Sequence, residues 1–375
     1  MTTEGKTLDK IEETPIQVPD TDLLQLADKI VAVIEKGKQH LAISINQTIK
    51  STYWNIGRHI VEFEQQGSAR AKYGAGLLSR LAKILRAKVG RGYSHPNLNN
   101  MRKFYLMFPS FQTADKFESS IFQTSEKLKI VSDKLTWSHI CELITIDDPL
   151  EREFYQNECV SEGWTVDALH RQKESGLFMR LALSKDKKGV IELAHKGQQI
   201  QSAEDVVKDT YTLEFLGIDA KKRYRESDLE QKLIDNMQKF LLELGKGFTF
   251  VGSQYALTIN NVHYYVDVVF YHRILKCFVL IDIKRGAVRH KDIGQMNMYM
   301  GYFNKEENVA GDNPPIGIVM GHYKDELMVE YATYGMDSNL FVSKYELFLP
   351  NKEELRKLVM DVLKRESHNG TQQAE

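Results

Sequence analysis

The amino-acid sequence predicts an α+β protein with an all-α N-terminal domain and a mixed-sheet α/β C-terminal domain. Before residue 184, apolar residues recur with the 3.6-residue period of amphipathic helices. After residue 210, helical segments alternate with short apolar runs that are typical of strands. The chain has 375 residues, which at roughly 150 residues per domain is enough for two domains with their own cores.

Composition predicts where these domains begin and end. The segment 185–209 is rich in charged residues and glycine, and we interpret it as a linker with one short element. The helical domain then covers residues 20–184 and the α/β domain residues 210–366. The two polar ends, residues 1–19 and 367–375, are expected to be disordered.

The overall composition excludes several classes of protein. An apolar content of 42% and a charged content of 27% exclude wholesale disorder. The chain has no run of about 18 apolar residues that could cross a membrane, and its polar N-terminus lacks the apolar segment of a secretory signal. Its three widely spaced cysteines fit reduced thiols better than a disulfide framework. We therefore expect a cytoplasmic protein without a membrane partner.

The net charge of −1 conceals an uneven distribution of charge along the chain. Residues 51–110 hold ten basic and two acidic side chains, so this block carries +8 and the remainder of the chain −9. A block this basic is typical of a surface that faces a polyanion. The alternative interpretation is an ordinary solvated face that is rich in lysine and arginine.

Two predicted helices in the basic block have the arrangement of a helix-turn-helix module. They span residues 76–89 and 96–107, and Gly90-Arg91-Gly92 separates them. Ser94 or His95 can cap the second helix, which carries asparagine and arginine side chains. The alternative is a helical hairpin that packs on the other domain or on a protein partner. The candidate nucleic-acid-binding residues of the block are Arg58, Arg70, Arg80, Lys83, Arg86, Arg91, Asn97, Asn100, Arg102 and Lys103.

The remaining periodicity predicts the order of elements in both domains. Further helices of the N-terminal domain are expected at residues 136–145, 149–162 and 166–183. The C-terminal domain begins with a helix at 228–244 and continues with strands at 249–259, 262–271 and 277–284, a helix at 292–303 and a strand at 316–321. Later strand candidates lie at residues 328–333 and 340–342. Helices interspersed with strands in this order predict a mixed sheet.

Two carboxylates interrupt the apolar central strands of the second domain. Asp267 lies within one strand, and Asp282 lies within the next, where Lys284 follows on the same face. If the turn between these strands is centred on residues 274 and 275, Asp267 and Asp282 lie directly opposite each other with Cβ atoms about 5 Å apart. Two carboxylates at that distance repel each other by about 3 kcal/mol at an effective dielectric constant of about 20.

A divalent cation between the two carboxylates would convert this repulsion into binding. Oxygen ligands of this kind suit Mg²⁺ or Mn²⁺, and Lys284 could then orient or deprotonate a water or stabilise charge on a phosphate. The alternative is a pair of acids at the strand ends that Lys284 or Arg285 neutralises. An aspartate inside an apolar strand is costly unless it has such a role.

Three further residues are candidates for the same site. Glu230 either completes a capping box that begins at Ser227 or supplies a third acid to the metal. Gln295 and Tyr299 lie four residues apart, and therefore on one face of their helix. Either could hold a phosphate or orient the lysine, and either could equally be surface packing.

The residues Glu230, Asp267, Asp282-Ile283-Lys284 and Gln295-Met-Asn-Met-Tyr299 resemble the motifs of the PDDEXK nuclease superfamily, including its Q-x-x-x-Y extension. More closely, the chain from about Tyr53 to Pro350 is similar to the YhcG-like family of bacterial proteins. These proteins join an N-terminal helical domain of formerly unknown function to a PDDEXK nuclease domain. The similarity rests on Trp54-Asn-Ile-Gly-Arg58, Arg70-Ala-Lys-Tyr-Gly74, Leu213-Glu-Phe-Leu-Gly217, Phe240-Leu-Leu-Glu-Leu-Gly-Lys-Gly-Phe248 and Asp292-Ile-Gly-Gln-Met-Asn-Met-Tyr299.

The resemblance implies a restriction-endonuclease-like fold for the C-terminal domain and Mg²⁺ or Mn²⁺ as cofactor. It implies that Asp267 and Asp282 ligate the ion with Glu230 completing the acid set, that Lys284 serves the attacking water, and that Gln295 and Tyr299 position the backbone. One departure is Asp282, which stands where the superfamily more commonly has glutamate. The shorter side chain still ligates a metal ion.

The sequence therefore predicts a metal-dependent endonuclease with an N-terminal nucleic-acid-binding domain, and the superfamily favours DNA over RNA as its substrate. Motifs for ATP binding, for zinc proteases and for serine hydrolases do not occur in the sequence. Two alternatives are a DNA-binding module that recognises structure without cutting and a protein-interaction accessory of a restriction or defence system. A resolvase-like homodimer is compatible with the resemblance, but no segment of the sequence identifies a dimer face.

Overall fold

The computed structural model describes residues 20–65, 76–108, 134–219, 224–336 and 339–369. The chain divides into two units, Met1–Trp137 and Ser138–Glu375. No helix in the described part of the chain combines the length and the apolar character that a membrane span requires. All three cysteines are free thiols, as the sequence predicts.

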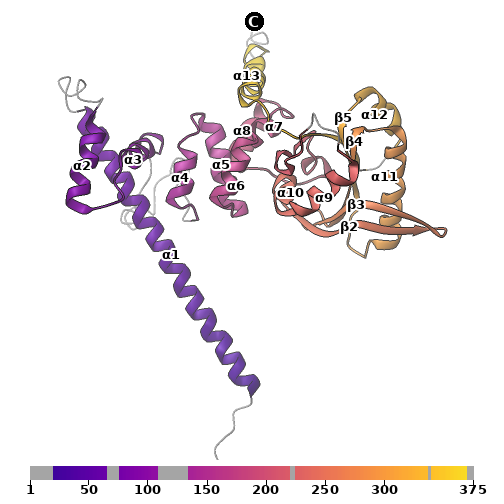
Figure 1. Ribbon diagram of the computed structural model, residues 1–375, viewed down its shortest axis with the longest axis horizontal. Coiled ribbons are helices and arrows are strands. Elements are labelled where there is room, and N and C mark those ends of the chain that lie inside the picture. The colour runs from indigo at the N-terminus through magenta and orange to yellow at the C-terminus, as the bar shows by residue number, and fades with distance from the viewer. Residues whose placement is uncertain (1–19, 66–75, 109–133, 220–223, 337–338, 370–375) are drawn as a thin grey trace, which may run out of the picture. The chain divides into compact units, whose positions relative to one another are not determined.

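The first unit is built on α1 (Asp20–Gln65), α2 (Leu77–Val89) and α3 (His95–Met107) (Figure 1). Its core is formed by Ile60 of α1 with Leu98 and Met101 of α3. The backbones of α1 and α3 approach closely at Gly57, because a Cβ atom there would lie 2.0 Å from the Met101 carbonyl oxygen. Only glycine allows the two helices to pack at this distance.

The turn between α2 and α3 follows the predicted capping chemistry. The predicted helices 76–89 and 96–107 agree with the observed bounds to within one residue. Gly90 and Gly92 have φ values of +89° and +111°, in the region that favours glycine. The Ser94 hydroxyl accepts a hydrogen bond from the Asn97 amide at 3.4 Å and caps α3 as expected.

The second unit begins with short helices that precede the sheet. They are α4 (Trp137–Leu143), whose first residue closes the first unit, α5 (Pro149–Glu162), α6 (Val166–Glu174), α7 (Leu177–Ala182) and α8 (Lys187–Lys196). The single helix expected at 166–183 is two helices, because Gly176 adopts φ of +63° between α6 and α7.

The segment 185–209, interpreted above as a linker, is largely structured in this unit. It contains α8 and the 3₁₀ helix η3 (Ala203–Asp205). Val190, Leu193 and Ala194 of α8 are buried, so this segment contributes to the core. Of the charged residues that suggested a linker, Lys185 and Asp186 are exposed just before α8, and the Asp186 carboxylate caps the helix by accepting a hydrogen bond from the Gly189 amide at 2.7 Å.

The second unit contains a six-stranded mixed sheet with the order β1-β6-β5-β4-β3-β2. Strands β1, β6, β5 and β4 are parallel to one another, whereas β3 runs antiparallel to both of its neighbours, β4 and β2. The mixed sheet predicted for the C-terminal domain is therefore confirmed. The strands are β1 (Thr210–Thr212), β2 (Phe248–Ile259), β3 (Val262–His272), β4 (Cys277–Ala287), β5 (Ile316–Tyr323) and β6 (Leu340–Glu346).

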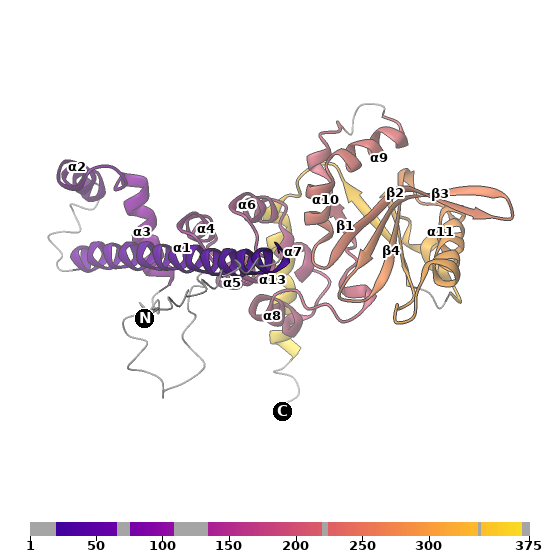
Figure 2. The ribbon, with the colours of Figure 1, turned by 90° about the horizontal axis from the view of Figure 1, so that it is seen from below.

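Helices cover both faces of this sheet (Figures 1 and 2). One layer is α9 (Glu226–Asp235) and α10 (Met237–Leu244), whose apolar residues share a core with β3 and β4. The other is α11 (His290–Tyr302), which continues into the π-helix η5 (Phe303–Glu307) and packs on the opposite face. The helix expected at 228–244 is divided at Asn236, which caps both halves.

Residues 326–333 form helix α12 (Glu326–Thr333), so the strand predicted at 328–333 is wrong. Asp325 caps this helix, because its carboxylate accepts a hydrogen bond from the Met328 amide at 3.1 Å. The neighbouring strands β5 and β6 are parallel, and parallel neighbours require a crossover between them. The last element in the described part of the chain is α13 (Lys352–Asn369), so residues 367–369 of the expected disordered tail are helical, and residues 370–375 lie outside the described residues.

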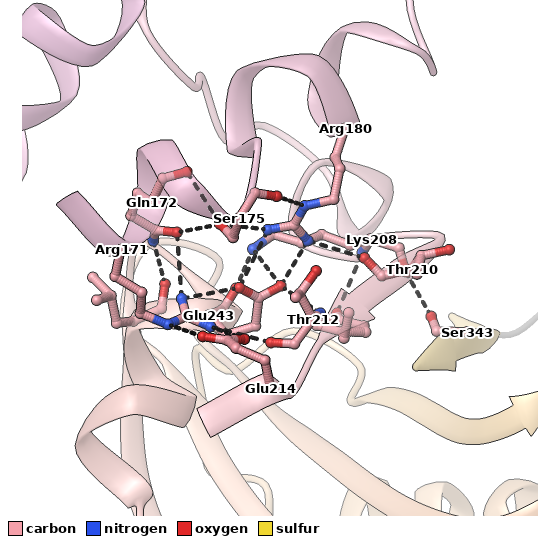
Figure 3. A network of polar contacts seen from close by, with 12 residues as sticks. Arg171, Gln172, Ser175, Arg180, Lys208, Thr210, Thr212, Glu214, Glu243 and Ser343 are labelled. Atoms are coloured by element: carbon pink, nitrogen blue, oxygen red, sulfur yellow. Dashed lines mark hydrogen bonds and ion pairs between the residues drawn. The ribbon is translucent and has the colours of Figure 1, made fainter. Parts of the chain in front are cut away.

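A buried network of charges joins α6 and α7 to β1 and α10 (Figure 3). Glu243 of α10 is fully buried, and its carboxylate lies 2.7 Å from Arg180 Nη1 and 3.2 Å from Arg171 Nη1. The same carboxylate accepts the Thr212 backbone N–H at 3.0 Å. Burial alone would raise the pKa of Glu243, but the surrounding cations outweigh it and hold the pKa at about 2.

Lys208 is the third cation of this network, and it donates a hydrogen bond to the backbone carbonyl of Glu243. Its own pKa is lowered to about 8, because burial disfavours the ammonium and Arg180 and Arg171 repel it. The lowered pKa of Glu243 means that the network stabilises its charged form, whereas the lowered pKa of Lys208 means that the network destabilises its charged form. Three cations surround one carboxylate, so Glu243 is well compensated and Lys208 is the surplus charge.

Candidate active site

The β3–β4 hairpin has the register that the sequence predicts. Five pairs from Val268↔Ile281 to His272↔Cys277 are in register, and each has residue numbers that sum to the same value as Asp267 and Asp282. Asp267 and Asp282 occupy the next position beyond the Val268↔Ile281 pair, at the end of the ladder away from the turn. The predicted register is therefore confirmed, and it brings the two carboxylates to neighbouring strands at the point where β3 and β4 separate.

Asp267 is held by the backbone of the neighbouring strand. The side chain is 8% exposed, and its Oδ2 accepts a hydrogen bond from the Ile283 amide at 2.7 Å. Burial raises the pKa of Asp267 well above its usual range, and repulsion from the Asp282 carboxylate is the second largest cause. This carboxyl group therefore holds its proton more tightly than an ordinary aspartate until a cation or another donor compensates its charge.

Asp282 and Lys284 form an ion pair on β4, as their common strand face predicts. Asp282 is buried, and its Oδ2 lies 2.8 Å from Lys284 Nζ. Burial disfavours the ammonium of Lys284, but the Asp282 carboxylate outweighs it, and the pKa of Lys284 is raised above its usual range. Lys284 is consequently a cation at neutral pH and cannot act as a general base in this state.

Glu226, at the start of α9, is the second acid that contacts Lys284. Its Oε1 lies 3.3 Å from Lys284 Nζ, and its Oε2 accepts a hydrogen bond from the Arg285 amide at 3.0 Å. Glu226 is not among the site residues that the sequence predicts. A signal for it existed, because Glu226 and Glu230 lie four residues apart and so share one face of a helix.

Glu230 lies at the site and does not cap its helix. Asp228 fills the capping role, because its carboxylate accepts a hydrogen bond from the Arg225 amide at 2.8 Å. Glu230 Oε2 accepts a hydrogen bond from Gln254 Nε2 at 2.9 Å. Burial, and then the neighbouring Glu226, raise the pKa of Glu230, and Asp282 contributes in the same direction. Of the two alternatives for Glu230, the structure favours the acid of the site.

Gln295 and Tyr299 share one face of α11 and contact each other. The Gln295 amide donates a hydrogen bond to the Tyr299 hydroxyl. Tyr299 is fully buried, and its ring packs edge-on against Tyr264 with centroids 6.4 Å apart. Burial raises the pKa of Tyr299, and the charges of Asp282, Lys284 and Asp267 also act on it. The pair therefore lies within electrostatic range of the acids.

Gln254 of β2 is the other residue of the site that the sequence does not predict. Its Nε2 donates to Glu230 at 2.9 Å and lies 3.3 Å from Asp267 Oδ1. A single polar residue in a predicted strand carries no signal of this role, since only the folded sheet brings it to the acids.

The acids at this site can supply some of the ligands of a magnesium ion. Within the described residues, no group of three or more His, Cys, Asp or Glu side chains is arranged to hold a metal ion. Mg²⁺, however, is commonly bound through one or two carboxylates, with water and substrate phosphate as its other ligands. Asp282 Oδ2 is buried and contacts Lys284 Nζ at 2.8 Å. A carboxylate offers about four lone-pair sites on its two oxygens, so the Asp282 carboxylate can still bind a cation. Asp267 and Asp282 therefore fit the ion as a partial donor set.

Several of the candidate nucleic-acid-binding residues have structural partners. Arg58 and Arg102 form ion pairs with Glu62 at 3.4 Å and Glu64 at 2.7 Å. The Asn97 amide donates to the Gly92 carbonyl at 2.6 Å and accepts from Trp137 Nε1 at 3.0 Å. Asn97 thus stabilises the α2–α3 turn, and its side chain is half-buried where the sequence predicts an exposed position.

The other candidates differ in their exposure. Asn100 and Lys103 are half-buried on α3, and Arg70 lies outside the described residues. Four candidates are exposed on α2 and the turn that follows it, and these are Arg80, Lys83, Arg86 and Arg91. An exposed basic surface therefore remains on this part of the first unit.

Comparisons with known proteins agree with this organisation. Residues 29–180 match the family model of the DUF1016 N-terminal domain, and residues 204–360 match that of the YhcG PDDEXK nuclease domain. The chain is 35% identical over 349 residues to the Escherichia coli (strain K12) protein named "Putative nuclease YhcG". This similarity covers 88% of the chain and 92% of that relative.

Solved structures that are similar to this chain include two that each align with about a third of it. A repair endonuclease from Pyrococcus abyssi is 18% identical, with a TM-score of 0.25 and coverage of 34% of this chain and 50% of that one. EndoMS in a complex with double-stranded DNA is 15% identical, with a TM-score of 0.24 and coverage of 36% of this chain and 50% of that one. The aligned part spans about half the length of these structures.

The identity to the Escherichia coli relative extends over nearly the whole of both chains, and the two family models lie in the same order as the helices and the sheet of this structure. The protein therefore belongs to the YhcG family, whose members combine a DUF1016 N-terminal domain with a PDDEXK nuclease domain.

Proposed function

We propose that this protein is a metal-dependent nuclease that hydrolyses phosphodiester bonds in DNA. The observation that carries the proposal is the pair of buried acids on neighbouring strands, Asp267 and Asp282, with the ammonium of Lys284 2.8 Å from the second. Repulsion between two such carboxylates costs stability unless a cation or a proton compensates it. Family membership supports a nuclease, and the metal and the DNA substrate are our extension of it.

The roles of the side chains follow from their positions. Asp267 and Asp282 would hold Mg²⁺ or Mn²⁺, and Glu230 would complete the acid set. The bound ion would supply an activated water and offset charge on the phosphate. Lys284 stays protonated beside Asp282, so its role in this scheme is to stabilise negative charge.

The Gln295–Tyr299 pair would position the substrate backbone. Its hydrogen bond fixes the amide of Gln295 against the buried Tyr299, which limits the orientations available to both side chains. A polar pair with few rotamers is suited to holding a phosphate at a defined distance from the acids. Replacing Gln295 with alanine should raise the KM for the substrate and leave the free energy of unfolding nearly unchanged.

The exposed basic residues of α2 would provide the sequence-independent part of DNA binding. Arg80, Lys83 and Arg86 recur every three residues on an exposed helix surface. Contacts from such side chains to phosphates give affinity without reading bases. We retain DNA over RNA as the substrate, by analogy with the superfamily, and place the reaction in the cytoplasm of a bacterial cell.

A cleavage assay on linear, nicked, branched and single-stranded DNA tests the proposal. With Mg²⁺ or Mn²⁺, the wild-type protein should cut at least one of these substrates, and Lys284→Met should cut it at least about 100-fold more slowly. Cutting that persists in excess EDTA would contradict the metal dependence. Salt-sensitive binding to DNA without cutting any form would identify a binding module in place of a nuclease, and the absence of both would favour the accessory role.

A further inference from the structure

Gln254 adopts a backbone conformation that glutamine disfavours. Its φ is +48°, in the left-handed region, although it lies in the middle of β2. The flanking pairs Ser253↔Val268 and Tyr255↔Val266 are regular, so this residue lies opposite Asp267. A shift of register between Phe250 and Gly252 precedes it on the same strand. Irregularities of this kind in a strand commonly redirect a side chain next to an active site.

The redirected side chain reaches acids on two other elements. Its Nε2 donates a hydrogen bond to Glu230 Oε2 of α9 at 2.9 Å and contacts Asp267 Oδ1 of β3 at 3.3 Å. An amide nitrogen carries two hydrogens, so one group can serve both carboxylates. The amide therefore links the helix that carries Glu230 to the strand that carries Asp267.

This link compensates a local excess of negative charge. The charges of Glu226 and Asp282 act on Glu230, and those of Asp282 and Glu230 act on Asp267, whereas Lys284 contacts Asp282 and Glu226. Glu230 and Asp267 thus receive their shared donor from β2. A donor between two acids keeps them close enough to act on one cation, although they repel each other.

We propose that Gln254 is a positioning residue of the metal site, which holds Glu230 toward Asp267 so that both acids are available to a divalent cation. The proposal rests on the proposed metal-dependent nuclease. Gln254 acts through Glu230, and its left-handed backbone conformation costs conformational energy. Partners of metal ligands in other proteins change metal affinity by about 10- to 100-fold when they are removed, which sets the expected size of the effect.

The test is calorimetric binding of Mn²⁺ to the full-length protein. Gln254→Ala and Gln254→Gly should each weaken binding by about 10- to 100-fold relative to wild type. Gln254→Gly should also unfold at a temperature no lower than that of wild type, because glycine adopts the left-handed conformation without strain. Gln231→Ala, which removes an exposed glutamine of α9, is the matched control and should bind Mn²⁺ as wild type does.

A double-mutant cycle with Glu230→Ala shows whether Gln254 acts through Glu230. The double variant should bind Mn²⁺ no more weakly than Glu230→Ala alone, because the amide then has no glutamate to position. Additive losses would overturn the proposed route through Glu230. Affinity of Gln254→Ala within twofold of wild type would overturn the positioning role.

The failure of this proposal can be told apart from the failure of the nuclease proposal. If wild type binds Mn²⁺ and Asp282→Ala abolishes binding while Gln254→Ala has no effect, only the role of Gln254 is wrong. If wild type itself binds no Mn²⁺, the metal-dependent function is wrong, and the role of Gln254 is overturned with it.

Discussion

Asp282 and Lys284 lie two residues apart on β4 and form an ion pair in which Oδ2 and Nζ are 2.8 Å apart. The pair lies at the point where the β3–β4 ladder ends and where Asp267 bonds to the Ile283 amide. A lysine paired in this way remains protonated at neutral pH. The geometry therefore assigns lysine an electrostatic role and leaves proton removal from water to another group.

The metal-free protein should gain stability when Asp267 is replaced by asparagine. The raised pKa of Asp267 means that the folded state holds a proton more tightly than the unfolded state, so its contribution to stability is lost as pH rises through the folded pKa. Asp267→Asn has no such titration and should be more stable than wild type at pH 8 in EDTA, by about 1–2 kcal/mol. Urea unfolding measures this difference.

The difference should shrink as the pH is lowered, because wild-type Asp267 is then protonated. Added Mg²⁺ should stabilise wild type and leave Asp267→Asn unchanged. A variant that is less stable than wild type at pH 8 in EDTA would show that Asp267 is neutralised within the protein, as a purely structural acid would be.

Glu243 should make the protein sensitive to acid. Its folded pKa of about 2 lies below the ordinary value of 4.5, so its contribution to stability is present above pH 4.5 and is lost as pH falls toward 2. Glu243→Gln should lose about 3–5 kcal/mol of unfolding free energy at pH 7, because Arg180 loses its carboxylate partner and Arg171 keeps only Glu214. Below pH 5 the variant should lose stability less steeply than wild type.

Glu353→Gln, on the exposed start of α13, is the control for this comparison, and its stability profile should follow that of wild type. Denaturant unfolding at several pH values provides the measurement. Equal slopes for Glu243→Gln and wild type between pH 5 and pH 3 would contradict the assignment of an ionised Glu243.

The segment that matches the nuclease family model, residues 204–360, should not fold on its own. A fragment of residues 204–360 lacks Arg171 and Arg180, and so leaves Glu243 buried without either guanidinium. A fragment of residues 138–375 retains the whole network and the buried face of α8. We expect cooperative thermal unfolding, followed by circular dichroism, for the longer fragment only. A cooperative transition in the shorter fragment would show that the network is dispensable.

The basic surface of α2 should contribute to DNA binding through phosphates. Replacing Arg80, Lys83 and Arg86 with glutamine should reduce the magnitude of the slope of log affinity against log salt concentration by about 3, one for each lost contact. Arg102→Gln is the control, because Arg102 already pairs with Glu64 and should change the slope less. Fluorescence anisotropy with a labelled duplex at several salt concentrations measures the slopes. An unchanged slope in the triple variant would remove α2 from the DNA-binding surface.

Much of the sheet and the central acids could be predicted from the sequence because local rules determine them. The β3–β4 register depends on one short turn, so the position of Asp267 relative to Asp282 followed from counting residues. The pairing of Asp282 with Lys284 followed from the two-residue period of a strand.

The remaining features depend on tertiary structure. Residues 328–333 read as a strand because a short apolar run does not distinguish strand from helix, and only the parallel β5–β6 pairing requires the crossover. Gln254 and Glu226 join the site through β2 and α9, which approach it from separate parts of the sequence. The sequence predicts Asn97 as an exposed side chain that contacts bases, because its hydrogen-bond partner Trp137 lies 40 residues away in the sequence.

The most direct test of the proposed function is the single-turnover cleavage rate of DNA with Mg²⁺ for wild type, Asp282→Asn and the surface control Asp235→Asn. We predict that wild type and Asp235→Asn cut at the same rate, and that Asp282→Asn cuts at least about 100-fold more slowly because it loses a ligand and the partner of Lys284. Cleavage by Asp282→Asn at the wild-type rate would contradict the proposed active site.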